Sequence, residues 1–235
     1  MTTTVAGTQP YAWPWHASLD PGRLALVVTG VQRSYAEASI EVPSAIDRIE
    51  RLSGVVRRAG GIVCHARHTS PGPRRRPLLP EVGTEAWAPV LRPGPGDLLV
   101  ACAGHDAFFG SSLDHELRSH GRDLLVVVGL AAEVTVSGTV RSANDRGYEC
   151  LTPTDVSAPL DPWTFEHELR SVTMSGGIFG AIGPVAPLVE ALQRHTTATP
   201  LDATPSGPTP TAPTPSGPAG AEPNPDHEPA LEETA

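Results

Sequence analysis

Polar and reactive side chains follow four apolar runs of the sequence, each at the point where its run ends. In chain order, these groups are Thr29, Gly30, Gln32, Arg33 and Tyr35; His65, Arg67 and His68; Cys102, His105 and Asp106; and Ala131, Glu133 and Thr135. Histidine, carboxylate and thiol side chains exchange protons or act as nucleophiles near neutral pH. The set predicts catalysis or ligand binding if the fold brings the four ends together.

The segments that carry these groups predict such a fold. Short apolar runs typical of buried strands lie at residues 24–31, 61–67, 96–103, 123–130 and 148–156. Helical patterns lie between or after them, at residues 45–60, 111–121, 133–146, 165–172 and 185–195. Strand–helix alternation predicts a three-layer α/β fold with a doubly wound, mostly parallel sheet. Because ligands bind beyond the carboxyl ends of such strands, the four groups are expected to line one cleft.

Composition indicates one globular domain over residues 1–195 and a tail over residues 196–235. The chain has 235 residues, of which 39% are hydrophobic, enough for one core of ordinary size. The tail consists largely of Pro, Thr, Ala and Gly and has six carboxylates but no Arg. Because it has too few apolar groups to offset the entropy cost of ordering, we expect it to be disordered.

Charge and cysteine content argue against several functions. The net charge is −9, whereas non-specific nucleic-acid binding needs a basic face; the run Arg74 to Arg76 lies among prolines, as in a solvated turn. No apolar run reaches membrane-spanning length, and the polar start lacks a signal-peptide pattern, so we expect no membrane contact and a cytoplasmic location. Cys64, Cys102 and Cys150 lack disulfide-framework or zinc spacing. We expect neither a metal nor a cofactor.

Four motifs resemble those of the isochorismatase-like cysteine hydrolase superfamily, over residues 11–192. The stretch "VTGVQRSY" is similar to the family's strand end, Asp-x-Gln-x-x-Phe, and "CAGHDAFFGSSL" to its Lys followed by Ser-Ala-Phe-x-Gly-Thr-x-Leu. The stretch "GLAAEVTV" is similar to the turn where a Cys opens a helix, and "GGIFG" to a segment of the branch that hydrolyses ureidoacrylate and biuret-type amides. The resemblance implies this fold, a small-molecule substrate and a homo-oligomer.

The resemblance also implies which residues would do the family's chemistry, in which a Cys thiolate attacks a carbonyl or imine carbon. An Asp takes the thiol proton and a Lys stabilises the charged pair. Aligned residue by residue, the Asp position holds Gly30, the Lys position holds Cys102 and the Cys position holds Thr135. The N–H groups of Ala131 and Thr135 would form the oxyanion hole, and Leu130–Ala131 is where the family often has a cis peptide. All three catalytic side chains are expected to be absent.

Each candidate residue also has a structural interpretation, and the alternatives stay open. Thr135 is typical of a helix cap and Cys102 of a small buried hydrophobe, although a thiol there is also a candidate relocated nucleophile. His105, Asp106 and Glu133 are candidates for proton transfer. The alternative is that His105 and Asp106 form a solvent-exposed loop pair and that Glu133 stabilises the helix dipole. The candidate substrate contacts are Arg33, Tyr35, His65, Arg67 and Phe109.

Two functions of different classes fit these observations. The first is an enzyme that keeps the pocket but performs a non-hydrolytic step, such as cyclisation, elimination, isomerisation or rearrangement, on a small metabolite. The second is a non-catalytic binding or assembly subunit, and a hydrolase that uses Cys102 is a third reading. The retained "HDAFFG" and "GGIFG" segments favour the first. Arg-only basicity with abundant Ala, Gly and Pro is typical of a GC-rich source such as an actinobacterium, where, by analogy, modified family members serve natural-product biosynthesis.

Overall fold

The structure is a computed structural model that describes residues 3–36, 41–68 and 91–198. The composition predicts a disordered tail from residue 196, but residues 196–198 belong to the helix Val185–Ala198. The rest of the predicted tail, from residue 199 onward, lies outside the described residues. The run Arg74 to Arg76 also lies outside them. Both interpretations therefore stay predictions.

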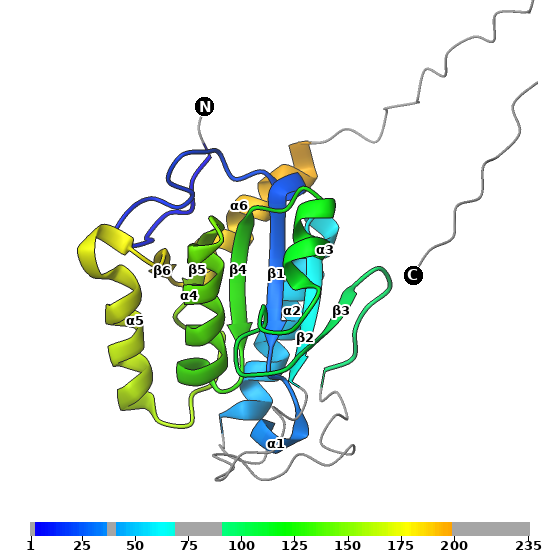
Figure 1. Cartoon of the computed structure of the whole chain (residues 1–235). Helices are drawn as coiled ribbons and strands as arrows, with labels where there is room; N and C mark the ends of the chain where they lie inside the picture. Colours follow the sequence, from blue (N-terminus) through cyan, green and yellow to red (C-terminus); the bar gives the residue numbers. More distant parts are fainter. Residues whose placement is uncertain (1–2, 37–40, 69–90, 199–235) are drawn as a thin grey trace, which may run out of the picture. The chain divides into compact units, whose positions relative to one another are not determined.

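A six-stranded parallel sheet forms the centre of the described part (Figure 1). Its strands, in spatial order, are β3 (Leu98–Cys102), β2 (Ile62–His68), β1 (Leu24–Thr29), β4 (Leu124–Gly129), β5 (Glu149–Pro153) and β6 (Ala181–Gly183). Every neighbouring pair is parallel. The predicted α/β fold with a doubly wound parallel sheet is confirmed, with one more strand than the sequence predicts.

Helices cover both faces of the sheet (Figure 1). One face packs against α2 (Val42–Ala59) and α6 (Val185–Ala198), and the other against α3 (Leu113–Ser119), α4 (Ser137–Asp145) and α5 (Pro162–Gly177). Along β1, Leu24, Leu26 and Val28 belong to the first core and Ala25 and Val27 to the second. Strands β1 and β4 are buried on both sides, which explains their uninterrupted apolar sequences.

The structure differs from the sequence-based expectation at two elements. The sequence does not predict β6, because three residues give no periodic pattern; backbone hydrogen bonds of 2.8 Å in each direction between Gln9 and Ile182 help to position it. The helix predicted over residues 133–146 is divided, since Ala132–Val136 form a π-helical turn and α4 begins at Ser137. Such turns are frequent at functional sites.

The strand order reverses between β1 and β4, which are neighbours in the sheet but not in the sequence. Thr29 pairs with Gly129 where the two strands end. From there β1 leads to α2 on one face and β4 leads to α4 on the other. Connections that diverge in this way leave a crevice at the carboxyl ends of the two strands, where the sequence predicts the functional residues.

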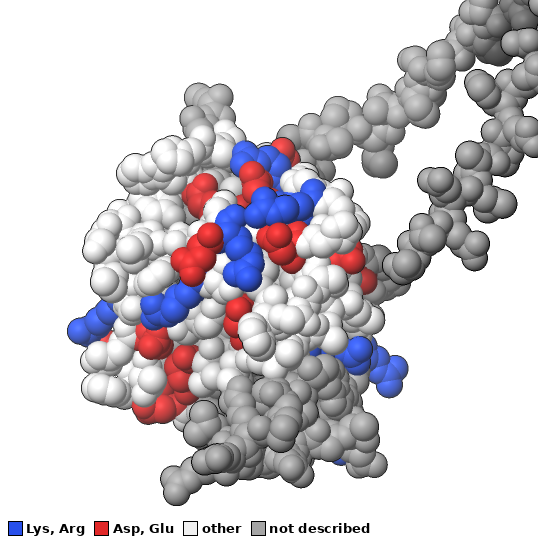
Figure 2. All heavy atoms as spheres, viewed as in Figure 1, with Lys and Arg blue, Asp and Glu red and all other residues white. Residues whose placement is uncertain are grey.

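The face formed by α3, α4 and α5 carries charges of both signs (Figure 2). Within these helices the ion pairs Arg118–Asp114 and Arg170–Glu166 link residues one turn apart. Exposed pairs of this kind contribute little to stability. In the part of the chain that the structure describes, no helix is both long and apolar enough to cross a membrane.

Candidate functional site

The end of β1 and the turn after β4 touch at Gly30. Its φ is +68°, in the left-handed region where a side chain is strained. A Cβ at this position would lie 1.9 Å from the carbonyl oxygen of Leu130 and 3.0 Å from Cγ2 of Thr135. A residue with a side chain therefore fits here only if the backbone moves.

Thr135 lies in the π-helical turn, and its side chain is completely buried. Its hydroxyl donates to the carbonyl oxygens of Leu130 (2.8 Å) and Ala131 (3.3 Å). Its N–H, a predicted oxyanion donor, donates to the Ala131 carbonyl oxygen at 2.9 Å, and the Leu130–Ala131 peptide bond is cis. Because carbonyl oxygens do not take up a hydroxyl proton, these partners do not activate Thr135 as a nucleophile.

His68, the last residue of β2, joins the ends of three strands. Its Nε2 lies 3.2 Å from Oγ1 of Thr29, and its Nδ1 lies 3.4 Å from Sγ of Cys102 and also contacts the Gly104 carbonyl oxygen. The Gln32 amide fixes the backbone of His68, accepting from its N–H (2.8 Å) and donating to its carbonyl oxygen (3.1 Å). Burial lowers the pKa of His68, so its imidazole is neutral at pH 7.

Cys102 ends β3 and is completely buried. Its thiol donates to the carbonyl oxygen of Arg67 at 3.3 Å and faces His68. Burial, with a smaller contribution from the charge of Asp106, raises the pKa of Cys102 to about 12. Since the thiolate is the nucleophilic form, a thiol with this pKa is poorly suited to covalent catalysis at neutral pH.

Tyr35 and His105 meet beside His68. Tyr35 lies in the short helix α1 (Arg33–Ala36) and His105 in the loop after β3. The Tyr35 hydroxyl lies 3.0 Å from Nδ1 of His105, whose ring centroid is 6.0 Å from that of His68. Burial raises the pKa of Tyr35, so its hydroxyl stays protonated and can donate to His105. Because His105 is half-buried, this pair lies between the buried residues and solvent.

The sequence of this chain matches a known protein family. The model of the isochorismatase domain matches residues 24–181, from the first residue of β1 to the first residue of β6. The chain belongs to the isochorismatase family. Its sheet and helices are those of a hydrolase fold, as the motifs around Gly30, Cys102 and Thr135 imply.

Individual relatives agree with this assignment. Streptothricin hydrolase from Streptomyces noursei is 30% identical over 191 residues, covering 71% of this chain and 68% of that protein. The ureidoacrylate amidohydrolase of Methylobacterium radiotolerans is 26% identical over 218 residues, covering 77% and 84%. The crystal structure of a cysteine hydrolase from Pseudomonas syringae pv. phaseolicola, 18% identical, matches with a TM-score of 0.65 over 75% of this chain and 95% of that one. The last likeness shows the fold alone.

Glu133, a predicted proton-transfer group, holds the segment before α5 in this isochorismatase-family fold. Its carboxylate accepts hydrogen bonds of 2.9 Å from the N–H groups of both Leu160 and Asp161. Asp161 in turn caps α5 by accepting from the N–H groups of Trp163 and Thr164. Two backbone donors therefore occupy Glu133, and the geometry supports a structural role for it.

His65 and His68, three residues apart in β2, lie on opposite faces of the sheet because strand side chains alternate. His65 Nε2 contacts Oδ2 of Asp97 at 2.9 Å, and Arg57 of α2 binds both oxygens of Asp97 at 2.7 and 2.6 Å. Burial alone would raise the pKa of Asp97, but hydrogen bonds from Arg57, the Gly94 N–H and His65 hold it below its usual value. The structure thus places His65 in an ion-pair cluster, and not beside Tyr35 and His105.

The other predicted contact residues lie at different places around the sheet ends. Arg67 lines a hollow on the α2 face together with His65, and Arg33 is exposed. Phe109 is 61% exposed, and its ring lies over Gly104 in the His105 loop. Asp106 supports the same loop by accepting from the Phe108 N–H at 2.8 Å. Of these residues, Phe109 and Asp106 share a loop with His105.

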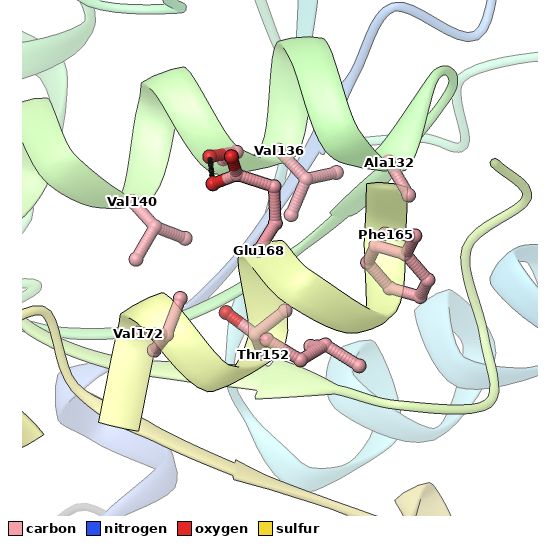
Figure 3. A pocket seen from close by; sticks show the side chains of 9 residues that line it. Ala132, Val136, Val140, Thr152, Phe165, Glu168 and Val172 are labelled. Carbon is pink, nitrogen blue, oxygen red and sulfur yellow. Dashed lines mark hydrogen bonds between the residues drawn. The ribbon is translucent and has the colours of Figure 1, made fainter. Parts of the chain in front are cut away.

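A small pocket lies over β5 between α4 and α5 (Figure 3). Figure 3 shows Glu168 of α5 directed toward α4, where it accepts hydrogen bonds of 2.6 Å from both Ser137 and Arg141. The hydroxyl of Thr152, which also faces the pocket, is buried without a hydrogen-bond partner among the described residues. The other lining side chains are mainly apolar: Ala132, Val136, Val140, Phe165, Leu169 and Val172. We interpret this pocket as part of the packing of α4 and α5 against β5.

Sequence reasoning places Thr29, Gln32 and His68 at the predicted strand ends. It does not predict the hydrogen bonds by which these residues join those ends. Asp97 follows a glycine just before β3, and nothing in the local sequence indicates that its carboxylate binds Arg57. Within the described ranges, no group of three or more His, Cys, Asp or Glu residues is placed to hold a metal ion.

Proposed function

We propose that this chain has lost the family's Asp-Lys-Cys triad and performs a non-hydrolytic reaction on a small metabolite. Gly30, Cys102 and Thr135 stand where the resemblance expects the three catalytic side chains. Their surroundings support the proposal, because Gly30 has no room for a side chain, the Cys102 thiol is protonated at neutral pH and the Thr135 hydroxyl is bonded to carbonyl oxygens.

The hydrogen bond between Tyr35 and His105 is the observation that carries the proposal. A histidine can take and return a proton near neutral pH, and in the tautomer in which Nδ1–H of His105 donates to the Tyr35 oxygen, Nε2 is the basic atom of the ring. Cyclisation, elimination, isomerisation and rearrangement all include reactions in which a proton is taken from one substrate atom and delivered to another. None of them needs an acyl-enzyme intermediate, so the lost nucleophile is not required.

The relatives support a substrate class. Their names refer to streptothricin and ureidoacrylate, both substrates of hydrolases. We therefore propose that the substrate is a small polar metabolite of natural-product biosynthesis. It has an amide or related carbonyl group with an acidic proton on a neighbouring atom. From the resemblance we also propose a homo-oligomer. From the charge and apolar pattern of the sequence we propose that it acts in the cytoplasm, with neither nucleic acid nor membrane as a partner.

The test is a metabolite screen in oxygen-18 water, read by mass spectrometry. Streptothricin, ureidoacrylate and a library of small carbonyl metabolites are incubated with the protein. A product of unchanged mass, or one that has lost water or ammonia, without the label is expected. Tyr35→Phe should lower its rate about tenfold and His105→Gln about 100-fold or more, because general acid–base groups contribute about 100- to 10,000-fold.

The matched control is His120→Gln, which alters an exposed histidine at the end of α3 and should leave the rate unchanged. A labelled product would instead indicate hydrolysis. Equal turnover by the wild type and His105→Gln would show that His105 does not move the proton.

A non-catalytic binding or assembly subunit is the second candidate. It is favoured by the packing of the strand ends, where Thr29, Cys102 and Thr135 are completely buried and hydrogen-bonded within the protein. This candidate predicts no turnover of any library member. It also predicts a stable partner in affinity purification that is retained by Tyr35→Phe and His105→Gln.

A further inference from the structure

A second hollow lies at the other end of the sheet from Tyr35 and His105. This hollow is open to solvent and has a volume of about 420 Å³, within the range of small-molecule sites. Its lining includes Tyr11, Trp15, His16, Asn144 and Glu149. Glu149 is the first residue of β5, and in a parallel sheet the amino ends of all strands lie opposite the carboxyl ends. The segment before β1 runs beside β6 and the end of α5 here (Figure 1). The hollow is therefore separate from the candidate active site.

Three aromatic rings stand in sequence along this hollow. The ring centroids of Tyr11 and Trp15 are 5.0 Å apart with planes at 79°, and those of Trp15 and His16 are 5.8 Å apart with planes at 87°. Rings at nearly right angles present their faces in different directions, as the walls of a cage do. Trp15 is 58% exposed, so its ring is available to a ligand.

One carboxylate lies among these rings. Glu149 accepts a hydrogen bond from the backbone N–H of Trp15, and this bond holds the Glu149 side chain beside the rings. The residues that line the hollow include no Arg, and the chain has no Lys. Arg23, which interacts electrostatically with Glu149, lies outside the lining and forms an ion pair with Asp123. Burial, followed by the charge of Glu149, raises the pKa of Tyr11 to about 12, which keeps its ring neutral.

We propose that this hollow is a binding site for a small organic cation of the alkylammonium class. Aromatic faces attract such cations through the ring quadrupole, Trp most strongly, and the attraction is greatest when a carboxylate is also present. A divalent metal does not fit as well, because Ca²⁺ and Mg²⁺ need about six oxygen ligands and the lining offers one carboxylate. The site binds a cation whose charge is spread over methyl groups.

Calorimetric titration with choline tests the proposal. Its neutral analogue, 3,3-dimethylbutan-1-ol, has the same shape without the charge, and should bind at least about tenfold more weakly, which is the range of a cation–aromatic contact. Trp15→Leu keeps an apolar side chain but removes the ring. Glu149→Gln removes the charge but keeps an oxygen for the Trp15 N–H. Each substitution should weaken choline binding about tenfold.

Asp145→Asn is the matched control for Glu149→Gln, because it removes one negative charge from an exposed residue four positions away that does not line the hollow. It should leave choline binding unchanged, and thermal unfolding confirms that every variant is folded. Equal binding of choline and its neutral analogue would overturn the proposal. So would an absence of choline binding to the wild type, or binding that Trp15→Leu and Glu149→Gln leave unchanged.

Discussion

Gly30 has no room for a side chain at the end of β1. Replacement by Asp would introduce a carboxylate, but its Cβ would lie 1.9 Å from the Leu130 carbonyl oxygen. We expect Gly30→Asp to lower the free energy of unfolding by more than about 3 kcal/mol, since backbone strain and steric overlap add. Urea denaturation measures this change.

Gly121→Asp is a close control for that substitution. Gly121 has a φ of +65°, close to the +68° of Gly30, but nothing lies within 4 Å of a Cβ built on it. It should lose only the roughly 1 kcal/mol that a left-handed conformation costs a residue with a side chain. Equal losses at the two positions would contradict the steric interpretation of Gly30.

His68 predicts how stability depends on pH. Burial lowers its pKa in the folded protein, so the unfolded chain binds the proton more readily. The stability that neutral His68 contributes is present above the unfolded pKa of about 6.5 and is lost as the pH falls below that value. We expect the free energy of unfolding, measured in urea, to be lower at pH 5.5 than at pH 7.5.

The variant His68→Gln identifies the residue responsible for this pH dependence. His65 also has its pKa lowered, primarily by burial, so the variant should show a smaller pH dependence than the wild type but retain some. His120→Gln, which changes an exposed side chain, should keep all of it. A pH dependence unchanged in His68→Gln would show that His68 titrates normally in the folded state.

The contact of α4 and α5 with β5 gives a prediction at the scale of elements. Thr152 of β5 has a buried hydroxyl without a hydrogen-bond partner among the described residues, and a buried unsatisfied group costs about 1–3 kcal/mol. Thr152→Val keeps the shape and removes this hydroxyl. It should raise the free energy of unfolding by about 1 kcal/mol in urea denaturation.

Thr139 of α4 provides the opposite case. It is completely buried as well, but its Oγ1 accepts the Ala107 N–H at 3.0 Å. Thr139→Val should therefore destabilise the protein by about 1–3 kcal/mol, because the amide of Ala107 loses its partner. If both substitutions changed stability in the same direction, hydrogen bonding would not explain either.

Elements also show what a single sequence can predict. Buried strands such as residues 24–29 and 124–129 can be predicted from the sequence, because a strand covered on both faces is apolar throughout. The π-helical turn at Ala132–Val136 cannot be predicted in this way, since its residues follow the same apolar spacing as an α-helix. Strand β6 is too short for any period, and its place depends on partners far away in the sequence, among them Gln9.

For the site, the sequence predicted which residues reach the strand ends but not which of them meet. Tyr35 and His105 are 70 residues apart in the chain, and no local pattern links them. Glu133 and His65 have the chemistry of catalytic residues, yet their partners are backbone amides before α5 and the carboxylate of Asp97. Residue type is local information, whereas side-chain direction depends on the packing of distant elements.

The whole molecule combines an isochorismatase-family fold with strand ends at which Gly30, Cys102 and Thr135 stand. The match of the isochorismatase domain model to residues 24–181, a range that holds β1 to β5, carries the family assignment. The proposed chemistry depends instead on the pair Tyr35 and His105, and the proposed cation site lies at the opposite end of the sheet.

Incubation of the protein with small amides and ureas in oxygen-18 water, followed by mass spectrometry, shows whether it hydrolyses them. With neither an activated nucleophile at Thr135 nor a thiolate at Cys102, we expect no labelled acid above the level in buffer alone. Formation of labelled acid by the wild type that disappears in Cys102→Ser or Thr135→Val would contradict this expectation, because covalent hydrolysis would then proceed through one of these residues.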